Sequence, residues 1–204
     1  SYSHYWDILA ELLQNSRDSI TRRRLAGHEG PFVIIVKIDS SNNSIDITDN
    51  GVGISPHLVK DLLGPGGSDK DAHRVEVGEK GVGLTFAIFS STHFSLQSRV
   101  EPGNEHAGAI TGAKTWLQSK ACDGDERPSY DETEVKESVP DQLIHNEIAY
   151  EFSSYCRIRL EGITPKDGDL SIFQLSGKQL LFLLKTKTAC GTTNRLHISS
   201  APSE

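Results

Sequence analysis

Hydrophobic and polar positions alternate along this chain with two periods, and these periods predict its secondary structure. Between residues 5 and 24, apolar residues return every three or four positions, as on one face of an amphipathic helix. Further helical patterns cover residues 84–91 and 176–189. β-Branched or alternating runs, typical of strands, occupy residues 32–39, 44–49, 93–100, 108–119, 155–163 and 192–198. This order of helix, hairpin and further mixed elements predicts an α/β protein.

Two segments interrupt the pattern. Residues 64–80 are rich in glycine and charge, which indicates a mobile loop. Residues 120–141 hold eight acidic and three basic residues with two prolines, and we expect an exposed, insertion-like loop there. Its "DGDE" run lacks the ligand spacing of an EF-hand, so a calcium site is not indicated. We therefore expect one domain over residues 1–204, with a tail or linker at 199–204.

Composition and charge exclude several classes of protein. A hydrophobic content of 36% with 24% charged residues is typical of a soluble globular domain, and no apolar run is long enough to span a bilayer. The net charge of −7 argues against strong binding of nucleic acid by this chain. Arg22, Arg23 and Arg24 complement the dipole of the first helix better than they indicate a DNA contact. Three scattered cysteines predict neither disulfides nor zinc, and the expected location is the cytoplasm, or the nucleus in a eukaryote.

The first glycine motif, "DNGVGI", spans Asp49 to Ile54 and follows directly on a predicted strand. Asn50-Gly51 alone is typical of a hairpin turn. A tight turn does not need Gly53 as well, however, and two glycines let a backbone pass close to a flat ligand. A nucleotide-base site with Asp49 as hydrogen-bond acceptor is the alternative interpretation.

The second motif, "GEKGVGL", spans Gly78 to Leu84 and precedes a predicted helix. Backbone N–H groups at such a helix start can converge on a phosphate. The motif is neither a Walker A loop, which needs G-x-x-x-x-G-K-[ST], nor a dinucleotide fingerprint, whose glycine spacing differs.

The first helix carries chemistry of its own. Glu11, Asn15 and Asp18 fall within about 60° of one another at 100° per residue. An amide oxygen can bind Mg²⁺ beside phosphate oxygens, and a carboxylate one turn away can deprotonate a water. For one helix alone a solvated polar face is the better interpretation, but the two glycine motifs favour a nucleotide site.

In this order, "ELLQNSRDSI", "DNGVGI" and "GEKGVGL" resemble the three nucleotide-binding boxes of the GHKL superfamily. That superfamily contains DNA gyrase B, the 90-kDa heat-shock chaperone, sensor histidine kinases, MutL proteins and MORC ATPases. A weaker match is "ACGTTNRL", in which Gly191-Thr192 resembles the family's Gly-Thr strand. The likeness covers about residues 5–100 and returns near 178–198, and the hydrolysing MutL, MORC and chaperone-like branch is nearest.

The resemblance implies a Bergerat fold, a two-layer α/β sandwich whose mixed, mostly antiparallel sheet is covered on one face by helices. It implies Glu11 as general base and Asn15 as the Mg²⁺ ligand, with Asp18 as a structural partner. It further implies that ATP is bound through the two glycine motifs and the Gly-Thr strand, at Asn15, Asp49, Gly51, Gly53, Ile54, Gly78, Lys80, Gly81, Val82, Gly83, Leu84 and Thr192. Residues 64–80 would form the ATP lid, from which Lys70 or Lys80 would reach the phosphates.

The function implied is Mg²⁺-dependent ATP hydrolysis by the ATPase module of a larger multidomain protein, with lid closure and ATP-dependent homodimerisation. Further domains of the same protein would be its partners, and nucleic acid would be bound through those domains and not by this one. The alternatives are a nucleotide-sensing switch with little hydrolysis and, less favoured by the Glu11–Asn15 pair, a histidine-kinase-type catalytic domain.

Overall fold

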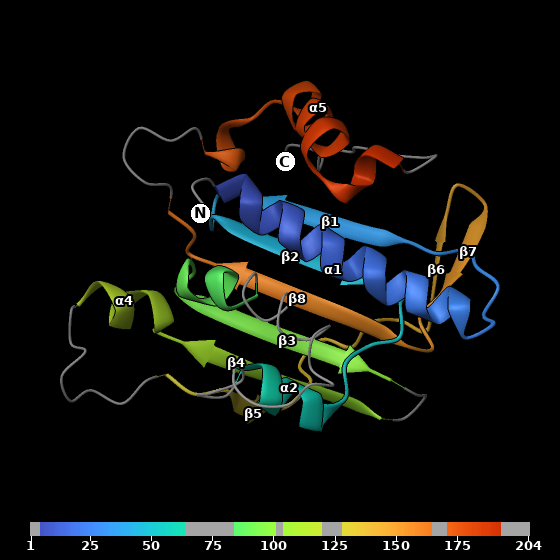
Figure 1. Ribbon diagram of the computed structural model, residues 1–204, viewed down its shortest axis with the longest axis horizontal. Coiled ribbons are helices and arrows are strands. Elements are labelled where there is room, and N and C mark those ends of the chain that lie inside the picture. Colours follow the sequence, from blue (N-terminus) through green and yellow to red (C-terminus); the bar gives the residue numbers. More distant parts are fainter. Residues whose placement is uncertain (1–4, 64–83, 101–103, 120–127, 165–170, 193–204) are drawn as a thin grey trace, which may run out of the picture.

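A six-stranded antiparallel sheet with helices on one face forms the body of the molecule (Figure 1). The computed structural model describes residues 5–63, 84–100, 104–119, 128–164 and 171–192. Within these residues the strands lie in the order β1-β2-β8-β3-β4-β5, and every neighbouring pair is antiparallel. The expected α/β fold with a largely antiparallel sheet is therefore confirmed.

Most of the helices and strands coincide with the segments predicted from periodicity. Helix α2 and the hairpin β6–β7 were not predicted. The helices are α1 (Tyr5–Leu25), α2 (Pro56–Leu63), α4 (Ala113–Gln118) and α5 (Gly177–Lys187), with residues 84–89 also helical. The sheet contains β1 (Ile34–Asp39), β2 (Ser44–Asp49), β3 (His93–Arg99), β4 (Glu105–Thr111), β5 (Asp131–Thr133) and β8 (Tyr155–Glu161). The remaining elements are the hairpin strands β6 (Gln142–His145) and β7 (Ile148–Glu151) and the 3₁₀ helices η1 (Ile172–Gln174) and η2 (Ala189–Thr192).

Local chemistry explains where several elements begin or turn. Ser176 and Gln179 form a reciprocal capping box that starts α5. Pro56 occupies the first turn of α2, where its missing N–H is not needed. Asn146 and Glu147 both have positive φ, which matches the two-residue turn of the β6–β7 hairpin.

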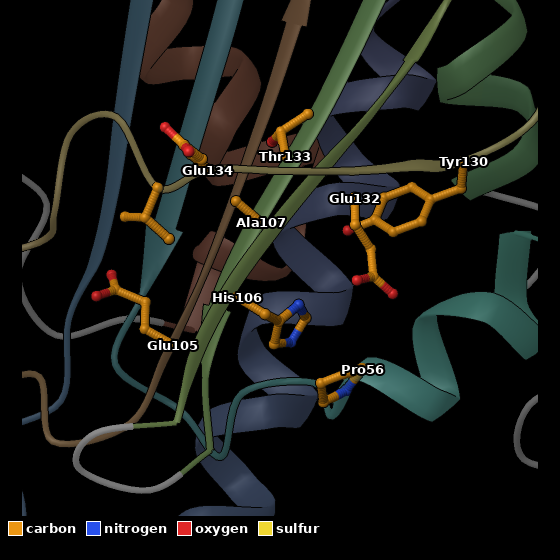
Figure 2. A pocket seen from close by; sticks show the side chains of 9 residues that line it. Pro56, Glu105, His106, Ala107, Tyr130, Glu132, Thr133 and Glu134 are labelled. Carbon is orange, nitrogen blue, oxygen red and sulfur yellow. The ribbon is translucent and has the colours of Figure 1, made fainter.

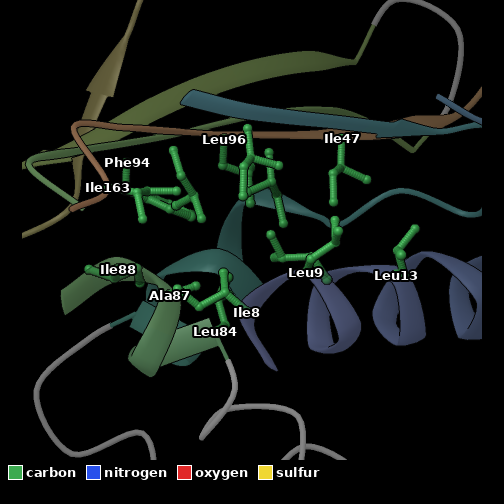
Figure 3. Close-up of a cluster of buried hydrophobic side chains, with 14 of the residues drawn as sticks. Ile8, Leu9, Leu13, Ile47, Leu84, Ala87, Ile88, Phe94, Leu96 and Ile163 are labelled. Atoms are coloured by element: carbon green, nitrogen blue, oxygen red, sulfur yellow. The ribbon is translucent and has the colours of Figure 1, made fainter. Parts of the chain in front are cut away.

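The hydrophobic core lies between the helices and one face of the sheet (Figure 3). Because strand side chains alternate, one face of β3 and β8 presents Phe94, Leu96, Ile158 and Leu160 to the helices. Helix α1 meets this face with Ile8, Leu9, Leu12 and Leu13, and the helical segment 84–89 meets it with Leu84, Ala87 and Ile88. Burial of this face holds α1 across the sheet and so sets the position of its polar residues.

The single strand predicted over residues 108–119 is wrong in its second half. Strand β4 ends at Thr111, and Gly112, with φ of 76°, turns the chain into α4. There Trp116 packs against Phe89 with ring centroids 5.9 Å apart. A short apolar run does not by itself distinguish strand from helix, and the packing of Trp116 decides the second half.

The acidic segment 120–141 is more than the exposed loop that its composition indicated. Its residues 131–133 form edge strand β5, paired with β4. Farther on, Glu137 pairs with Arg157 at 3.2 Å and Asp141 with Arg99 at 2.5 Å, on the sheet face opposite the helices. The acids of this segment therefore neutralise two arginines that the sheet presents.

We expect the core and the surface of this fold to respond very differently to truncation. Leu160 is fully buried, so Leu160→Ala should lower the free energy of unfolding by about 2–5 kcal/mol. Ile144 is 69% exposed, so Ile144→Ala should change it by less than about 0.5 kcal/mol. Urea denaturation of both variants measures the difference. Equal effects would contradict the assignment of β8 to the centre of the core.

Candidate nucleotide site

The carboxylate of Asp49 is buried where β2 ends. Asp49 lies opposite Ile34 of β1 and Cys156 of β8, and it is only 3% exposed. Its Oδ1 accepts a hydrogen bond from the Gly51 N–H at 3.0 Å, and the Ser16 and Ser19 hydroxyls of α1 donate to the carboxylate. Burial raises the pKa of Asp49 to about 6, although these hydrogen bonds oppose the shift. The molecule thus holds an acceptor with little exposure to water.

The polar line predicted on α1 belongs to the same helix as the two serines that act on this carboxylate. Ser16 and Ser19 are buried, whereas Glu11 and Asn15 are partly exposed. Glu11 and Asn15 lie about 140–180° around the helix axis from Trp6, and Trp6 packs under the Lys187 ammonium of α5 at 5.6 Å.

The Glu11–Asn15 flank therefore faces away from α5. Figure 1 shows α1 between α5 on one side and α2 with the helical segment 84–89 on the other. The tertiary structure thus brings the first motif and the Asp49 motif together. Asp18 accepts a hydrogen bond from Gln14 Nε2 at 2.8 Å within α1, and its structural role in the site stays a prediction.

Asn50 anchors the turn from its other side and does not belong to a hairpin. Its side chain is 1% exposed, accepts from the Val33 N–H at 2.8 Å and donates to Glu151 O at 3.1 Å. The buried guanidinium of Arg23 donates to Asn50 O at 2.5 Å and to Ser153 Oγ at 2.7 Å. Because the chain continues from this turn into α2 and not into a strand paired with β2, the hairpin interpretation of Asn50-Gly51 is wrong.

Both glycines of the turn are required by contacts with the protein itself. A Cβ on Gly51 would overlap the Ser19 hydroxyl and lie 2.7 Å from Asp49 Oδ1. Gly53 has a φ of +72°, and its Cβ would lie 3.0 Å from Tyr155 O. The sequence interpretation assigned these glycines to the approach of a flat ligand, but close packing on α1 and the sheet already accounts for them.

Two serines outside the motifs complete the support of the turn. The Ile54 N–H donates to Ser98 Oγ at 2.8 Å, and Ser98 Oγ donates to Tyr155 O at 2.8 Å. Ser154 Oγ donates to Gly51 O at 2.6 Å. Sequence reasoning missed these residues, as it missed Ser19, because isolated serines carry no spacing signal.

The phosphate motif lies largely outside the described residues. Among its members, Gly78, Lys80, Gly81, Val82 and Gly83 fall there, as do Lys70 and the whole expected lid at 64–80. Leu84 begins the helical segment 84–89 and its side chain is buried in the core. The phosphate role of this motif stays a prediction.

The strand expected at Gly191-Thr192 is not formed. Both residues belong to η2, which contacts α1, and residues 193–198 lie outside the described part of the chain. Within the described residues, the two strands beside β2 are β1 and β8. The described partners of Asp49 are therefore on α1 and in its own turn, while the support from Thr192 stays a prediction.

A separate cavity of about 400 Å³ lies at the β4–β5 edge near α2 (Figure 2). The side chains around it include Pro56, His106, Tyr130, Glu132 and Glu134. None of Glu11, Asn15 and Asp49 lines it. Its link to the turn is His106 Nε2, which lies 2.7 Å from Ile54 O and donates to it.

The donor set on α1 fits a magnesium ion that is bound together with phosphate. Within the described residues, no group of three or more His, Cys, Asp and Glu side chains could hold a metal ion. The amide oxygen of Asn15 is a hard ligand, and Mg²⁺ accepts few protein ligands when phosphate and water complete its shell.

None of the described helices is long and apolar enough to cross a membrane.

The buried carboxylate predicts an unusual dependence of stability on pH. Because its folded pKa of about 6 exceeds the ordinary value of 3.8, Asp49 binds a proton more tightly in the folded state. Its contribution to stability is therefore present below pH 3.8 and is lost as the pH rises towards 6.

Asp49→Asn should remove this dependence. Relative to Asp49→Asn, the unmodified protein should lose about 2–2.5 kcal/mol between pH 4 and pH 7, since one pKa unit corresponds to about 1.4 kcal/mol. Urea denaturation at each pH measures both proteins. Parallel curves for the two would show that the Asp49 carboxylate is not penalised by burial.

Comparison with known proteins agrees with this geometry. A family model described as "Histidine kinase-, DNA gyrase B-, and HSP90-like ATPase" matches residues 2–144, which include α1 and the Asp49 turn. The chaperone protein HtpG of Verminephrobacter eiseniae (strain EF01-2) is 27% identical over 118 residues, which are 48% of this chain and 18% of HtpG. Heat shock protein 90-5, chloroplastic, of Arabidopsis thaliana is 37% identical over 71 residues, which are 31% of this chain and 9% of that protein.

The chain spans less than a fifth of the length of either relative. The family match nevertheless covers more than half of the chain, and it contains both motifs that the structure brings together around Asp49. This chain therefore belongs to the family of histidine kinase-, DNA gyrase B- and HSP90-like ATPases.

Proposed function

We propose that this chain binds ATP with Mg²⁺ beside the Asp49 turn and hydrolyses it. The observation that carries the proposal is the buried Asp49 carboxylate, which interacts with two serines of α1. The same helix bears Glu11 and Asn15. The proposed base acceptor Asp49 then lies at the end of β2, and the proposed magnesium ligand Asn15 and general base Glu11 lie on the adjoining helix α1. Membership in an ATPase family supports the same conclusion.

Asp49 would select the base. An ionised carboxylate accepts hydrogen bonds and donates none. The exocyclic amino group of adenine is a donor, whereas guanine presents a carbonyl oxygen at the same place on the ring. A base without a donor would leave the buried carboxylate without its partner, and sites of this kind discriminate strongly.

At the phosphate end, α1 supplies two side chains one turn apart. Asn15 would contribute its amide oxygen to Mg²⁺, which when bound neutralises charge on the phosphate oxygens. Glu11 would orient the attacking water and take its proton. The backbone from Gly78 to Leu84 would hold the phosphates, as its sequence predicts.

The proposal extends to a conformational cycle. Binding of ATP would close residues 64–80 as a lid and favour a homodimer. The chain would act as the ATPase module of a larger multidomain protein, as the family resemblance implies. A nucleotide-sensing switch with little hydrolysis is the second candidate, and the next experiment separates the two.

Glu11→Ala should abolish hydrolysis and spare binding. Loss of a general base lowers turnover by about 10²–10⁴-fold, while ATP affinity with Mg²⁺ should stay within about threefold, because Glu11 does not contact the base. Phosphate release and calorimetric titration measure the two quantities. Glu29→Ala is the matched control, since Glu29 is an exposed carboxylate in the loop after α1 and should affect neither.

Three other outcomes would change the conclusion. Unchanged turnover in Glu11→Ala would exclude Glu11 as the base. Binding by both proteins without phosphate release from either would favour the nucleotide-sensing switch. Absence of ATP binding by the unmodified protein would refute the proposed function.

Base recognition should depend on pH through Asp49. The pKa of about 6 means that the carboxylate is increasingly protonated below that pH, where it loses its capacity to accept from adenine. ATP affinity should therefore fall as the pH drops from 7 to 5. Asp49→Asn should bind about 10- to 100-fold more weakly at pH 7, as expected for loss of a hydrogen bond to a charged group. Its affinity should lack the step near pH 6, and wild-type affinity in this variant would refute the adenine assignment.

A further inference from the structure

We propose that Ser19 is a positioning residue for base recognition, because its hydroxyl ties the Asp49 carboxylate and the following turn to α1. This inference rests on the proposed function. It adds a residue of α1 that lies outside the Glu11–Asn15 pair and outside both glycine motifs. It also makes α1 the common support of base recognition and hydrolysis.

The hydroxyl of Ser19 bonds both ends of the turn. It donates to the Asp49 carboxylate, and its oxygen accepts from the Val52 N–H at 3.1 Å. One donated hydrogen and one accepted hydrogen use a serine hydroxyl in both of its capacities. An alanine at this position would remove a donor from the carboxylate and an acceptor from the turn at once.

Close packing leaves the turn little freedom around this hydroxyl. Ser19 is 7% exposed, and Gly51 lies so close that a Cβ on it would overlap Ser19 Oγ. Ser19 therefore contacts three residues of this segment, namely Asp49, Gly51 and Val52. Ser16 also donates to Asp49, but Ser19 additionally holds the backbone that follows.

Ser19 also connects the two halves of the proposed site. It lies four residues after Asn15, which places the two side chains one turn apart on neighbouring parts of the α1 surface. A shift of the turn relative to α1 would therefore move the base acceptor relative to Asn15 and Glu11. The distance between base and phosphates in ATP is limited by its covalent structure, so both ends must be held together.

The electrostatic surroundings of Asp49 predict how replacement of Ser19 changes the pH dependence of ATP affinity. On α1, Arg22 and the two serine hydroxyls favour the ionised form of the Asp49 carboxylate. On β8, the Cys156 thiol faces this carboxylate, and burial raises the pKa of the thiol. Burial opposes ionisation. Loss of one donor should therefore move the pH at which ATP affinity falls to a higher value.

The test compares Ser19→Ala with Ser98→Ala in the full chain. Ser98 is a matched control because it is fully buried and anchors the same turn at the Ile54 N–H, without being a hydrogen-bond donor to Asp49. The measurements are ATP and GTP affinity with Mg²⁺ between pH 5 and pH 8, and turnover at saturating ATP.

Ser19→Ala should weaken ATP binding by about tenfold, as for loss of a hydrogen bond to a charged group. It should also lower the preference for ATP over GTP and move the midpoint of the pH profile upward. Turnover at saturating ATP should change much less, because Glu11 and Asn15 are unaltered. Ser98→Ala should weaken binding without moving the midpoint.

The inference is overturned if Ser19→Ala keeps the wild-type affinity, base preference and midpoint, or if Ser98→Ala moves the midpoint equally. If Ser19→Ala does not fold, as judged by circular dichroism, Ser19→Cys replaces it. Cysteine keeps the shape with a weaker donor, so a smaller upward movement of the midpoint is expected and an unmoved midpoint overturns the inference. Absence of ATP binding by the unmodified protein, or full binding by Asp49→Asn, would instead refute the proposed function.

Discussion

The burial of one carboxylate constrains much of this structure. Asp49 ends a central strand with 3% of its surface exposed, and an ionised group can remain there only if donors surround it. Those donors are Ser16 and Ser19 on α1 and the Gly51 N–H in the turn. Helix α1 must therefore lie across β2 at this point. The turn must also approach the helix so closely that only glycine fits at position 51.

The two faces of the sheet support this arrangement in different ways. The helix face is apolar and carries α1 and the helical segment 84–89 on a continuous core (Figure 3). The opposite face combines a smaller apolar cluster of Val139, Phe152 and Tyr155 with ion pairs. There Arg99 and Arg157 are paired with Glu105, Asp46 and acids of the segment 134–141. Gly53 packs on the backbone carbonyls of Arg99 and Tyr155, which are paired residues of β3 and β8. The acidic segment thus contributes to the sheet face behind the turn.

The proposed function gives α1 two roles, since it supports the proposed base acceptor and carries the residues proposed for hydrolysis. The apolar stripe of α1 fixes the helix on the sheet, and its flanks then carry the serines that hold Asp49 and the polar pair proposed for magnesium and water. Movement of α1 would alter both ends of a bound nucleotide together. Such a helix suits a family whose members share this ATPase domain, since the geometry within the domain does not depend on what the rest of each protein does.

The sequence by itself determined the elements with strong periodicity and the order of the motifs. The apolar stripe of α1, the alternating strands β1, β2, β3 and β8, and the capping box of α5 depend on neighbours within a few positions. Asp49 could be predicted as a base acceptor because it ends a strand and precedes two glycines. Only the tertiary structure decided that strand β4 ends at Thr111, that residues 131–133 join the sheet edge, and that Gly191 and Thr192 lie in η2.

The tertiary structure also decided which residues hold the acceptor. Ser19 meets Val52 across 33 positions, Ser98 meets Ile54 across 44 and Ser154 meets Gly51 across 103. A lone serine has the same local pattern in a loop, on a surface or beneath a buried carboxylate. What distinguishes these serines is the register of β8 against β2 and the depth at which α1 packs. Both depend on burial of the whole core and not on any short stretch of sequence.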